Sequence, residues 1–340
     1  MLDVVHSIWL AVPALCVIMY VVLDGYDLGI GVLTLFERDR ARRRSAVEVV
    51  AQTWDINESW LILLGLSLWS GFPAAFGAML PHVYIPVIVM LLSLAVRGFS
   101  TELISQRTGL GDGWVRAFGI ASLTAALAQG AALGLATQAV LLDTNGRFMG
   151  SADTGALGMA MPWLGAIALT VIYSLLGAAY LPTKLDSMHS ASRGRSLLIG
   201  SVVLAALFVL LMPVADAPLT LTGGRGVAVI VLLVISALAA VIVWRQFRRA
   251  PATAFGWTAA VVIALLLAIF VGRYPVLVAP DLTVQEAGAP MLTMWALLIA
   301  VGINVLLNLF YTFFAHRVFR GPIEEEYVEA HPALREETSA

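Results

Sequence analysis

The chain has 340 residues, of which 60% are hydrophobic and 12% are charged, and its formal net charge is −2. A soluble domain carries about twice that charged fraction, so the composition excludes a water-soluble globular protein, and the small net charge gives no indication of a nucleic-acid partner. The single cysteine, Cys16, excludes an intrachain disulfide and a thiolate-ligated iron–sulfur cluster built by this chain alone.

Apolar stretches long enough to cross the hydrocarbon core of a bilayer, about 20 residues each, recur along most of the chain. We expect an all-α polytopic membrane protein, with an integral membrane domain over residues 1–320 and a polar cytoplasmic tail over residues 321–340. The chain starts without the basic residues of a cleaved signal peptide, so the first stretch is expected to be a retained span. Nine transmembrane helices are predicted, at residues 8–35, 54–72, 77–97, 114–141, 158–181, 196–215, 226–244, 255–277 and 291–316.

The Lys and Arg residues are distributed unevenly among the connections. Of the 20, 17 fall in the tail or in the connections after odd-numbered spans, together with the adjoining helix ends, and the exceptions are Arg147, Arg225 and Arg273. Cytoplasmic loops carry the excess of basic residues. The N-terminus is therefore expected to face the periplasm and the C-terminus the cytoplasm, in the inner membrane of a bacterium.

The first predicted span carries two carboxylates, Asp24 and Asp27, in an otherwise apolar stretch. They are three residues apart, and such residues share a helix face, so both are expected to point into the bundle and away from lipid. Gly25 and Gly29 form a GxxxG step, which allows a partner helix to approach closely. An ionisable residue at this depth is expensive and indicates a functional site.

The second predicted span begins with another such pair, Asp55 and Glu58, in Trp54-Asp-Ile-Asn-Glu-Ser-Trp60. The same spacing predicts that this pair also points inward. In the expected orientation both lie within about two turns of the cytoplasmic face, at the level of Arg97, which is expected to close the third span.

Two interpretations of these four carboxylates remain open. Acids that step inward from the cytoplasm are typical of a proton-uptake path. Alternatively, Asp24 or Glu58 forms a structural ion pair with Arg97, and Asp55 and Glu58 are first-turn acids favoured by the helix dipole.

The five histidines do not predict a haem site within the chain. His82 is expected to start a helix at the periplasmic interface, and the others fall at span ends or in polar segments. A bis-histidine haem needs two facing histidines at depth, so no metal ligand is predicted here.

The order and spacing of these motifs resemble subunit II of the cytochrome bd ubiquinol oxidases, including the cyanide-insensitive branch. The resemblance rests on Leu23-Asp-Gly-Tyr-Asp-Leu-Gly-Ile-Gly31, an Arg-rich loop, and Trp54-Asp-Ile-Asn-Glu-Ser-Trp60. One departure lies in the ninth span, where the family often carries a proline at the position of Gly302-Ile-Asn-Val305. Asn304 and Asn308 are expected instead to form hydrogen bonds between helices. Further matches are Arg97-Gly98, Ala179-Tyr-Leu-Pro-Thr-Lys184, Arg273-Tyr-Pro275, Leu292-Thr293 and Val318-Phe-Arg-Gly321.

The resemblance implies a nine-helix subunit, built as two four-helix bundles plus one peripheral helix, that pairs with a haem-bearing subunit I. In that family subunit I holds two b haems and one haem d, oxidises quinol and reduces oxygen to water. Subunit II is implied to support assembly and proton delivery through positions matching Asp24, Asp27 and Asp55. In some members it holds a quinone beside the tryptophan that matches Trp54. A small single-span accessory subunit and membrane lipid are further implied partners.

A free-standing proton-coupled transporter is the competing hypothesis, because it also uses buried carboxylates. A transporter is expected to have broken helices in two matching halves and a substrate site at the midplane. The acids here lie in the first part of the chain and on one side, which favours the oxidase subunit.

Overall fold

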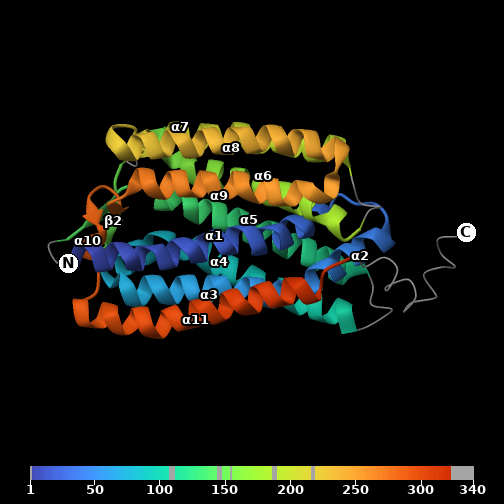
Figure 1. Cartoon of the computed structure of the whole chain (residues 1–340), viewed down its shortest axis with the longest axis horizontal. Coiled ribbons are helices and arrows are strands. Elements are labelled where there is room, and N and C mark those ends of the chain that lie inside the picture. The colour runs from blue at the N-terminus through green and yellow to red at the C-terminus, as the bar shows by residue number, and fades with distance from the viewer. Residues whose placement is uncertain are drawn as a thin grey trace, which may run out of the picture.

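The chain folds into long, roughly parallel α-helices, seen from the side in Figure 1. The computed structural model describes residues 2–106, 112–143, 148–153, 155–185, 190–215 and 219–322. Eight helices within these ranges are long and apolar enough to cross a membrane, so the predicted all-α polytopic architecture is confirmed. They are α1 (Leu2–Thr34), α4 (Pro73–Gln106), α5 (Asp112–Ala136), α6 (Gly155–Tyr180), α7 (Ala191–Leu211), α8 (Gly223–Arg249), α9 (Ala254–Arg273) and α11 (Met291–Val318).

The second predicted span coincides with α3 (Trp54–Gly71), an 18-residue helix beside α1 and α11. Three polar residues in its first two turns, Asp55, Asn57 and Glu58, keep its hydropathy below that of the other long helices. The predicted separation of the second span, 54–72, from the third is confirmed, because α3 ends at Gly71 and α4 begins at Pro73.

Helix α4 is longer at its C-terminal end than the sequence indicated. The expectation that the third span closes at Arg97 is wrong, because α4 continues to Gln106. The segment after Arg97 looks like a polar loop, but its hydroxyls stay within the helix. Ser100, Thr101 and Ser105 each donate to the carbonyl oxygen four residues earlier, so these hydroxyls find their partners within the helix.

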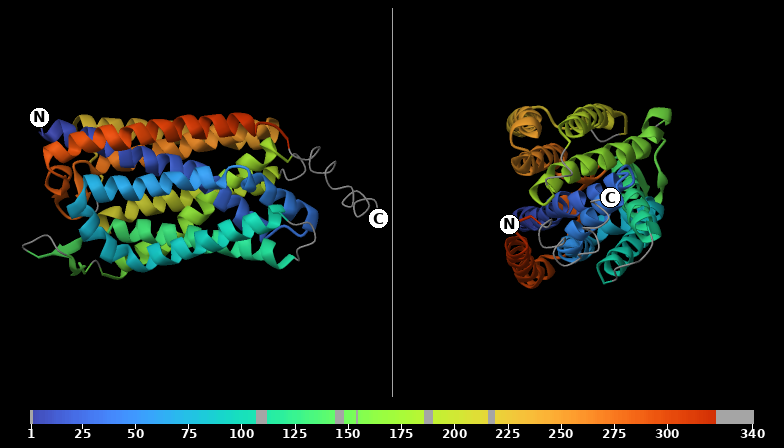
Figure 2. Two further views of the ribbon diagram at one scale, coloured as in Figure 1. Left: turned by 90° about the horizontal axis from the view of Figure 1, so that it is seen from below. Right: turned by 90° about the vertical axis from the view of Figure 1, so that its right-hand side faces the viewer.

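Helix α1 lies in the interior of the structure, where it contacts α3, α5, α6 and α11 (Figure 2). Helices α7 and α8 form one edge of the molecule, with α6 and α9 next to them, and α3 and α11 form the opposite edge (Figure 1). The N-terminal end of α1 and the C-terminal end of α11 lie at opposite ends of the helices. The central position of α1 explains why its polar residues are buried.

The GxxxG step of α1 packs closely on α6, so α6 is the partner helix that this step allows to approach. A Cβ atom on Gly29 would overlap the carbonyl oxygen of Tyr173, and one on Gly177 would lie 2.6 Å from the backbone nitrogen of Ile30. Contact between the two backbones therefore requires glycine on both sides.

Short elements connect the long helices, and the sequence analysis predicted none of them. Helix α2 lies in the Arg-rich connection, where the Asp39 carboxylate accepts hydrogen bonds from two backbone amides of its first turn. The predicted tail lies outside the described residues from 323 onward. The short elements are α2 (Arg40–Ala51), β1 (Val140–Leu142), β2 (Phe148–Ser151), η1 (Leu181–Thr183), η3 (Met212–Ala215), η4 (Pro251–Thr253), β3 (Val276–Val278), β4 (Leu282–Thr283) and α10 (Val284–Ala287).

Candidate functional site

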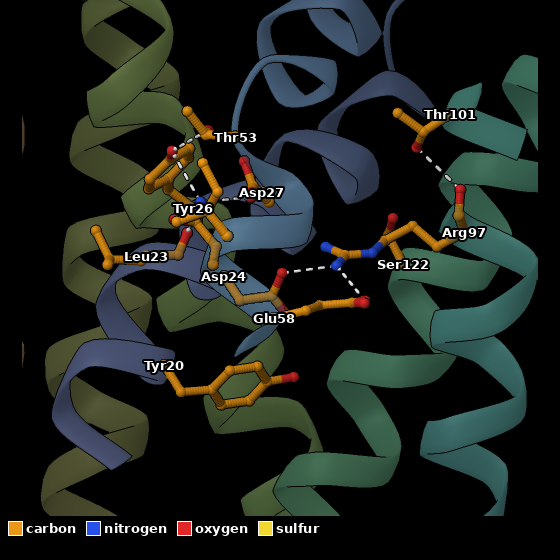
Figure 3. Close-up of polar contacts among 12 residues, drawn as sticks. Tyr20, Leu23, Asp24, Tyr26, Asp27, Thr53, Glu58, Arg97, Thr101 and Ser122 are labelled. Atoms are coloured by element: carbon orange, nitrogen blue, oxygen red, sulfur yellow. Dashed lines mark hydrogen bonds and ion pairs between the residues drawn. The ribbon is translucent and has the colours of Figure 1, made fainter. Parts of the chain in front are cut away.

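A cluster of charged side chains lies between α1, α3 and α4 (Figure 3). Asp24 and Asp27 come from α1, Glu58 from the second turn of α3, and Arg97 from the interior of α4. Asp24 is ten residues from the end of α1 and Arg97 nine from the end of α4, which places both roughly 14–15 Å from the same end of the helices. We call these four residues the buried acid cluster.

Arg97 joins two of the carboxylates. Its Nη2 atom lies 2.7 Å from Oδ1 of Asp24 and donates a 2.6 Å hydrogen bond to Oε1 of Glu58. The side chains of Arg97 and Asp24 are fully buried, and that of Glu58 is 22% exposed. The contact between Arg97 and Asp24 is an ion pair between two fully buried side chains. Glu58 is thus the member of this triad that reaches the surface of the chain.

Asp27 has a separate set of partners on the next turn of α1. Its Oδ2 atom accepts a 2.8 Å hydrogen bond from Nδ2 of Asn57, which also donates to the hydroxyl of Tyr26 at 3.0 Å. The Tyr26 hydroxyl lies 2.9 Å from Oγ1 of Thr53 and 3.2 Å from Nε2 of His316. This network links Asp27 to the last turns of α11.

Three further buried polar residues lie on the other side of Asp24. Tyr20, one turn earlier on α1, accepts a 2.7 Å hydrogen bond from Nε2 of Gln129, and the Tyr173 hydroxyl donates to Oε1 of Gln129 at 2.8 Å. Sequence reasoning missed these residues and Asn57, since it searched for the candidate site among the carboxylates and their charge partner. The available signal was Gln129 in the middle of an Ala- and Gly-rich apolar helix.

The structure does not bring Asp55 into the buried acid cluster. The buried face of the first turns of α3 contains Ile56, Asn57 and Trp60, whereas Asp55 is exposed. The prediction that Asp55 points inward is therefore wrong, and its place in the first turn fits the alternative of an acid favoured by the helix dipole. The ion pair proposed for Arg97 is confirmed, with both Asp24 and Glu58 as partners.

Trp54 packs on the backbone of α4 next to the buried acid cluster. A Cβ atom on Gly98 would lie 2.8 Å from the indole ring of Trp54. The indole is partly buried, so Trp54 joins the start of α3 to the residue that follows Arg97.

The polar residues that were expected at helix ends or between helices behave in two ways. The expectation that His82 starts a helix is wrong, because α4 begins at Pro73 and His82 lies inside it. Its ring bonds to the Leu135 carbonyl and the Ser151 hydroxyl, each at 3.0 Å. Asn308 accepts from Ser59 of α3 at 2.9 Å, so this predicted bond between helices is confirmed, whereas Asn304 donates within its own helix. Among the described residues no group of three or more His, Cys, Asp or Glu is arranged to hold a metal ion.

Three kinds of comparison with known proteins give consistent results. A family model described as cytochrome bd terminal oxidase subunit II matches residues 5–319. The chain is 28% identical over 209 residues to cytochrome bd-I ubiquinol oxidase subunit 2 of Escherichia coli K12, covering 59% of this chain and 55% of that relative. It is 32% identical over 98 residues to cytochrome bd ubiquinol oxidase subunit 2 of Bacillus subtilis, covering 28% of this chain and 29% of that relative.

The fold is similar to a chain in the solved structure of bd oxidase from Geobacillus thermodenitrificans, with a TM-score of 0.74. The similarity covers 93% of this chain and 98% of the other at 17% identity, which supports the fold alone. In sequence, this chain matches only 55% of the length of the Escherichia coli relative.

Proposed function

The chain belongs to the cytochrome bd terminal oxidase subunit II family, and from this premise we propose that it is the haem-poor subunit of a membrane complex that oxidises quinol and reduces oxygen to water. Its partner is a haem-bearing subunit I, and this chain supports assembly and delivers protons from the cytoplasm. Both curated relatives described above are named as subunit 2 of ubiquinol oxidases. Family membership removes the main argument for a free-standing transporter.

The observation that carries the proton role is the unequal charge of the buried acid cluster. One guanidinium, that of Arg97, faces the carboxyl groups of Asp24, Glu58 and, one turn away, Asp27. Excess negative charge at membrane depth is costly, so the cluster balances its charge by holding protons. A group of carboxyls that gains and loses a proton without unfolding is what a proton path needs.

We assign the steps of this path by exposure. Asp55 is exposed and lies one turn before Glu58, which is partly exposed and shares Arg97 with the fully buried Asp24. A proton taken up at Asp55 passes to Glu58 and then to Asp24, while Asp27 holds a further proton beside them. Arg97 acts as a positioning residue, because it keeps two carboxylates on one nitrogen atom and has no proton to give at neutral pH.

The arrangement in the membrane is proposed on the same basis. We assign α3 as a membrane span in addition to the eight helices named above, which makes nine. One bundle then consists of α1, α3, α4 and α5, the other of α6 to α9, and α11 is the peripheral helix. In agreement with the charge distribution, the basic C-terminal turns of α8 and α11 are assigned to the cytoplasmic side. The N-terminus then faces the periplasm of a bacterial inner membrane.

The hydrogen bonds of the described histidines support placing the haems in the partner subunit. His6 bonds to the Ala289 carbonyl, His82 to Leu135 and Ser151, and His316 to Tyr26 and the Thr312 carbonyl. We therefore place the two b haems and haem d in subunit I. For a quinone of structural type, Trp54 is the proposed contact, since its indole is only partly buried beside Gly98. A single-span accessory subunit and membrane lipid complete the proposed assembly.

Purification tests the proposed function. A tagged chain extracted from its native membrane in mild detergent is expected to bring a larger partner with it and to give a reduced-minus-oxidised spectrum of b and d haems. Recovery of the chain alone, without haem, from membranes that contain an active oxidase would contradict the assignment and favour a transporter.

A further inference from the structure

An open pocket of about 460 Å³ lies at the junction of α7 and α8, at the edge of the molecule away from the buried acid cluster. We call it the arginine pocket. The two helices come together there because Gly194 leaves room for the buried ring of Phe247. The residues that line it are Arg195, Trp244, Arg245, Arg248 and Arg249.

One side chain of the arginine pocket, that of Arg195, is held in place by two contacts with Trp244. The guanidinium of Arg195 stacks over the Trp244 ring, with its carbon 4.3 Å from the ring centroid, and its Nε atom donates a 3.1 Å hydrogen bond to the Trp244 carbonyl. Cation–π stacking fixes the plane of a guanidinium and leaves its outer nitrogens free to donate. Arg195 is therefore held in place and ready to bind an anion.

The positive charge of the arginine pocket is not balanced within the described part of the chain. Four guanidiniums line it, and none of them forms an ion pair with a described carboxylate. In contrast, Arg43 and Arg116 both form ion pairs with Asp112. Four unpaired guanidiniums in one pocket favour an anionic ligand with several oxygens, such as a phosphate group.

An apolar stripe leads from the membrane-spanning part of α8 into the arginine pocket. Val234, Leu238 and Val241 are exposed and follow one another at helical spacing, and the next positions on this face are Trp244 and Arg245. Tryptophan is typical of the level of the lipid headgroups. The stripe would contact an acyl chain while the arginines contact the headgroup, a combination that a free phosphate ion cannot use.

We propose that the arginine pocket between α7 and α8 binds the phosphate headgroup of an anionic phospholipid, with the acyl chains along the apolar stripe of α8. The inference uses only the membrane setting of these helices and does not depend on the proposed proton role. Basic pockets between transmembrane helices are suited to anionic headgroups. Such a lipid would join α7 to α8, which contact each other less than α7 contacts α6 or α8 contacts α9.

The test is a lipid titration of the complex purified through a tag on this chain. Phosphatidylglycerol and phosphatidylcholine with identical acyl chains are added to the delipidated complex in detergent, and binding is followed by native mass spectrometry. We expect phosphatidylglycerol to bind in preference to phosphatidylcholine. Equal binding of the two lipids would overturn the proposal.

The variant for this test is Arg248→Gln/Arg249→Gln, at the C-terminal end of α8. The matched control is Arg317→Gln/Arg320→Gln, which removes two exposed arginines at or just after the C-terminal end of α11. Each arginine is expected to contribute a factor of about five in affinity, so the double variant weakens phosphatidylglycerol binding roughly thirtyfold. The control binds as the wild type does. Unchanged binding by the pocket variant, or equal loss in the control, would contradict the site.

Two further arms address folding and the source of the phosphate. If the double variant does not assemble, Arg195→Gln is read in the same titration, with Arg195→Lys expected to keep more of the affinity because it retains the charge. Inorganic phosphate is added as a competitor. Displacement of the lipid by phosphate at equal concentration would assign the pocket to a free anion and overturn the lipid proposal.

Discussion

The Nη2 atom of Arg97 lies 2.7 Å from Oδ1 of Asp24, and both side chains are fully buried. The same nitrogen binds Glu58, so one guanidinium group connects the interior helix α1 with α3 and α4. This contact determines both the stability of the helix junction and the chemistry proposed for it.

Replacement of Arg97 is expected to be strongly destabilising. Arg97→Gln leaves the buried carboxylate of Asp24 without a cation, and breaking a buried pair from one side costs about 3–5 kcal/mol. The measurement is thermal unfolding of the purified complex in detergent. The double variant Arg97→Gln/Asp24→Asn is expected to recover part of the loss, because it removes the unpaired charge as well. A single variant as stable as the wild type would show that Asp24 does not need Arg97.

Replacement of Asn57 tests the second set of contacts. Asn57→Ala removes the hydrogen bonds to Asp27 and Tyr26, and a buried acceptor that loses its donor costs about 1–3 kcal/mol. Asn304→Ala is the matched control, because Asn304 is exposed and bonds only to its own helix. The control is expected to change the free energy of unfolding by less than about 0.5 kcal/mol. Equal effects of the two variants would remove Asn57 from the network.

Two glycine substitutions, one inside the contact between α1 and α6 and one outside it, are expected to have different effects on stability. In Gly29→Ala the new Cβ meets the Tyr173 backbone, which cannot move aside, so the two helices separate at a cost of about 1–3 kcal/mol. Gly256→Ala in α9 has open space around it and is expected to be neutral or to stabilise by up to about 1 kcal/mol. Thermal unfolding of both variants checks this. A Gly29→Ala protein with wild-type stability would mean that the backbones are not in contact.

The burial of Lys184 is expected to make the stability of the fold change with pH in the alkaline range. Its side chain donates to the Phe319 carbonyl and to Gln52, and only 6% of the residue is exposed, so burial lowers the pKa of its ammonium group below the ordinary 10.5. Between the lowered pKa and 10.5 the unfolded chain binds more protons than the folded one, so stability rises with pH in this window.

The comparison variant for this effect is Lys184→Met, which has no titratable group. The difference in melting temperature between wild type and variant is expected to shift in favour of the wild type as the pH approaches 10.5. A difference that stays constant with pH would show that Lys184 titrates in the folded protein as it does in water.

Hydropathy predicted the helices because each apolar stretch has to satisfy its backbone groups internally within a membrane. It missed α2 and the continuation of α4 past Arg97, since polar residues in a helix resemble a loop when only hydropathy is considered. In both regions the polar side chains have local partners: Asp39 caps α2, and Thr101 donates to the Arg97 carbonyl within α4.

The spacing of the acids predicted part of the candidate site. Asp24 and Asp27 are buried together, as residues three apart on one helix face should be. The same spacing failed for Asp55, because Glu58 joins the buried acid cluster whereas Asp55 lies off the buried face of α3 that carries Asn57 and Trp60. Spacing defines which residues share a face, but only the packing of neighbouring helices decides which face is buried.

The most direct test of the account is the turnover of the purified complex that carries Asp24→Asn. Asparagine keeps the size of the side chain but cannot hold a proton, and losing a proton-transfer group costs a factor of ten or more. We expect quinol-dependent oxygen consumption to fall at least about tenfold, with the haem spectrum unchanged. Wild-type turnover at full haem content would contradict proton delivery through Asp24 and leave its pair with Arg97 as a structural contact alone.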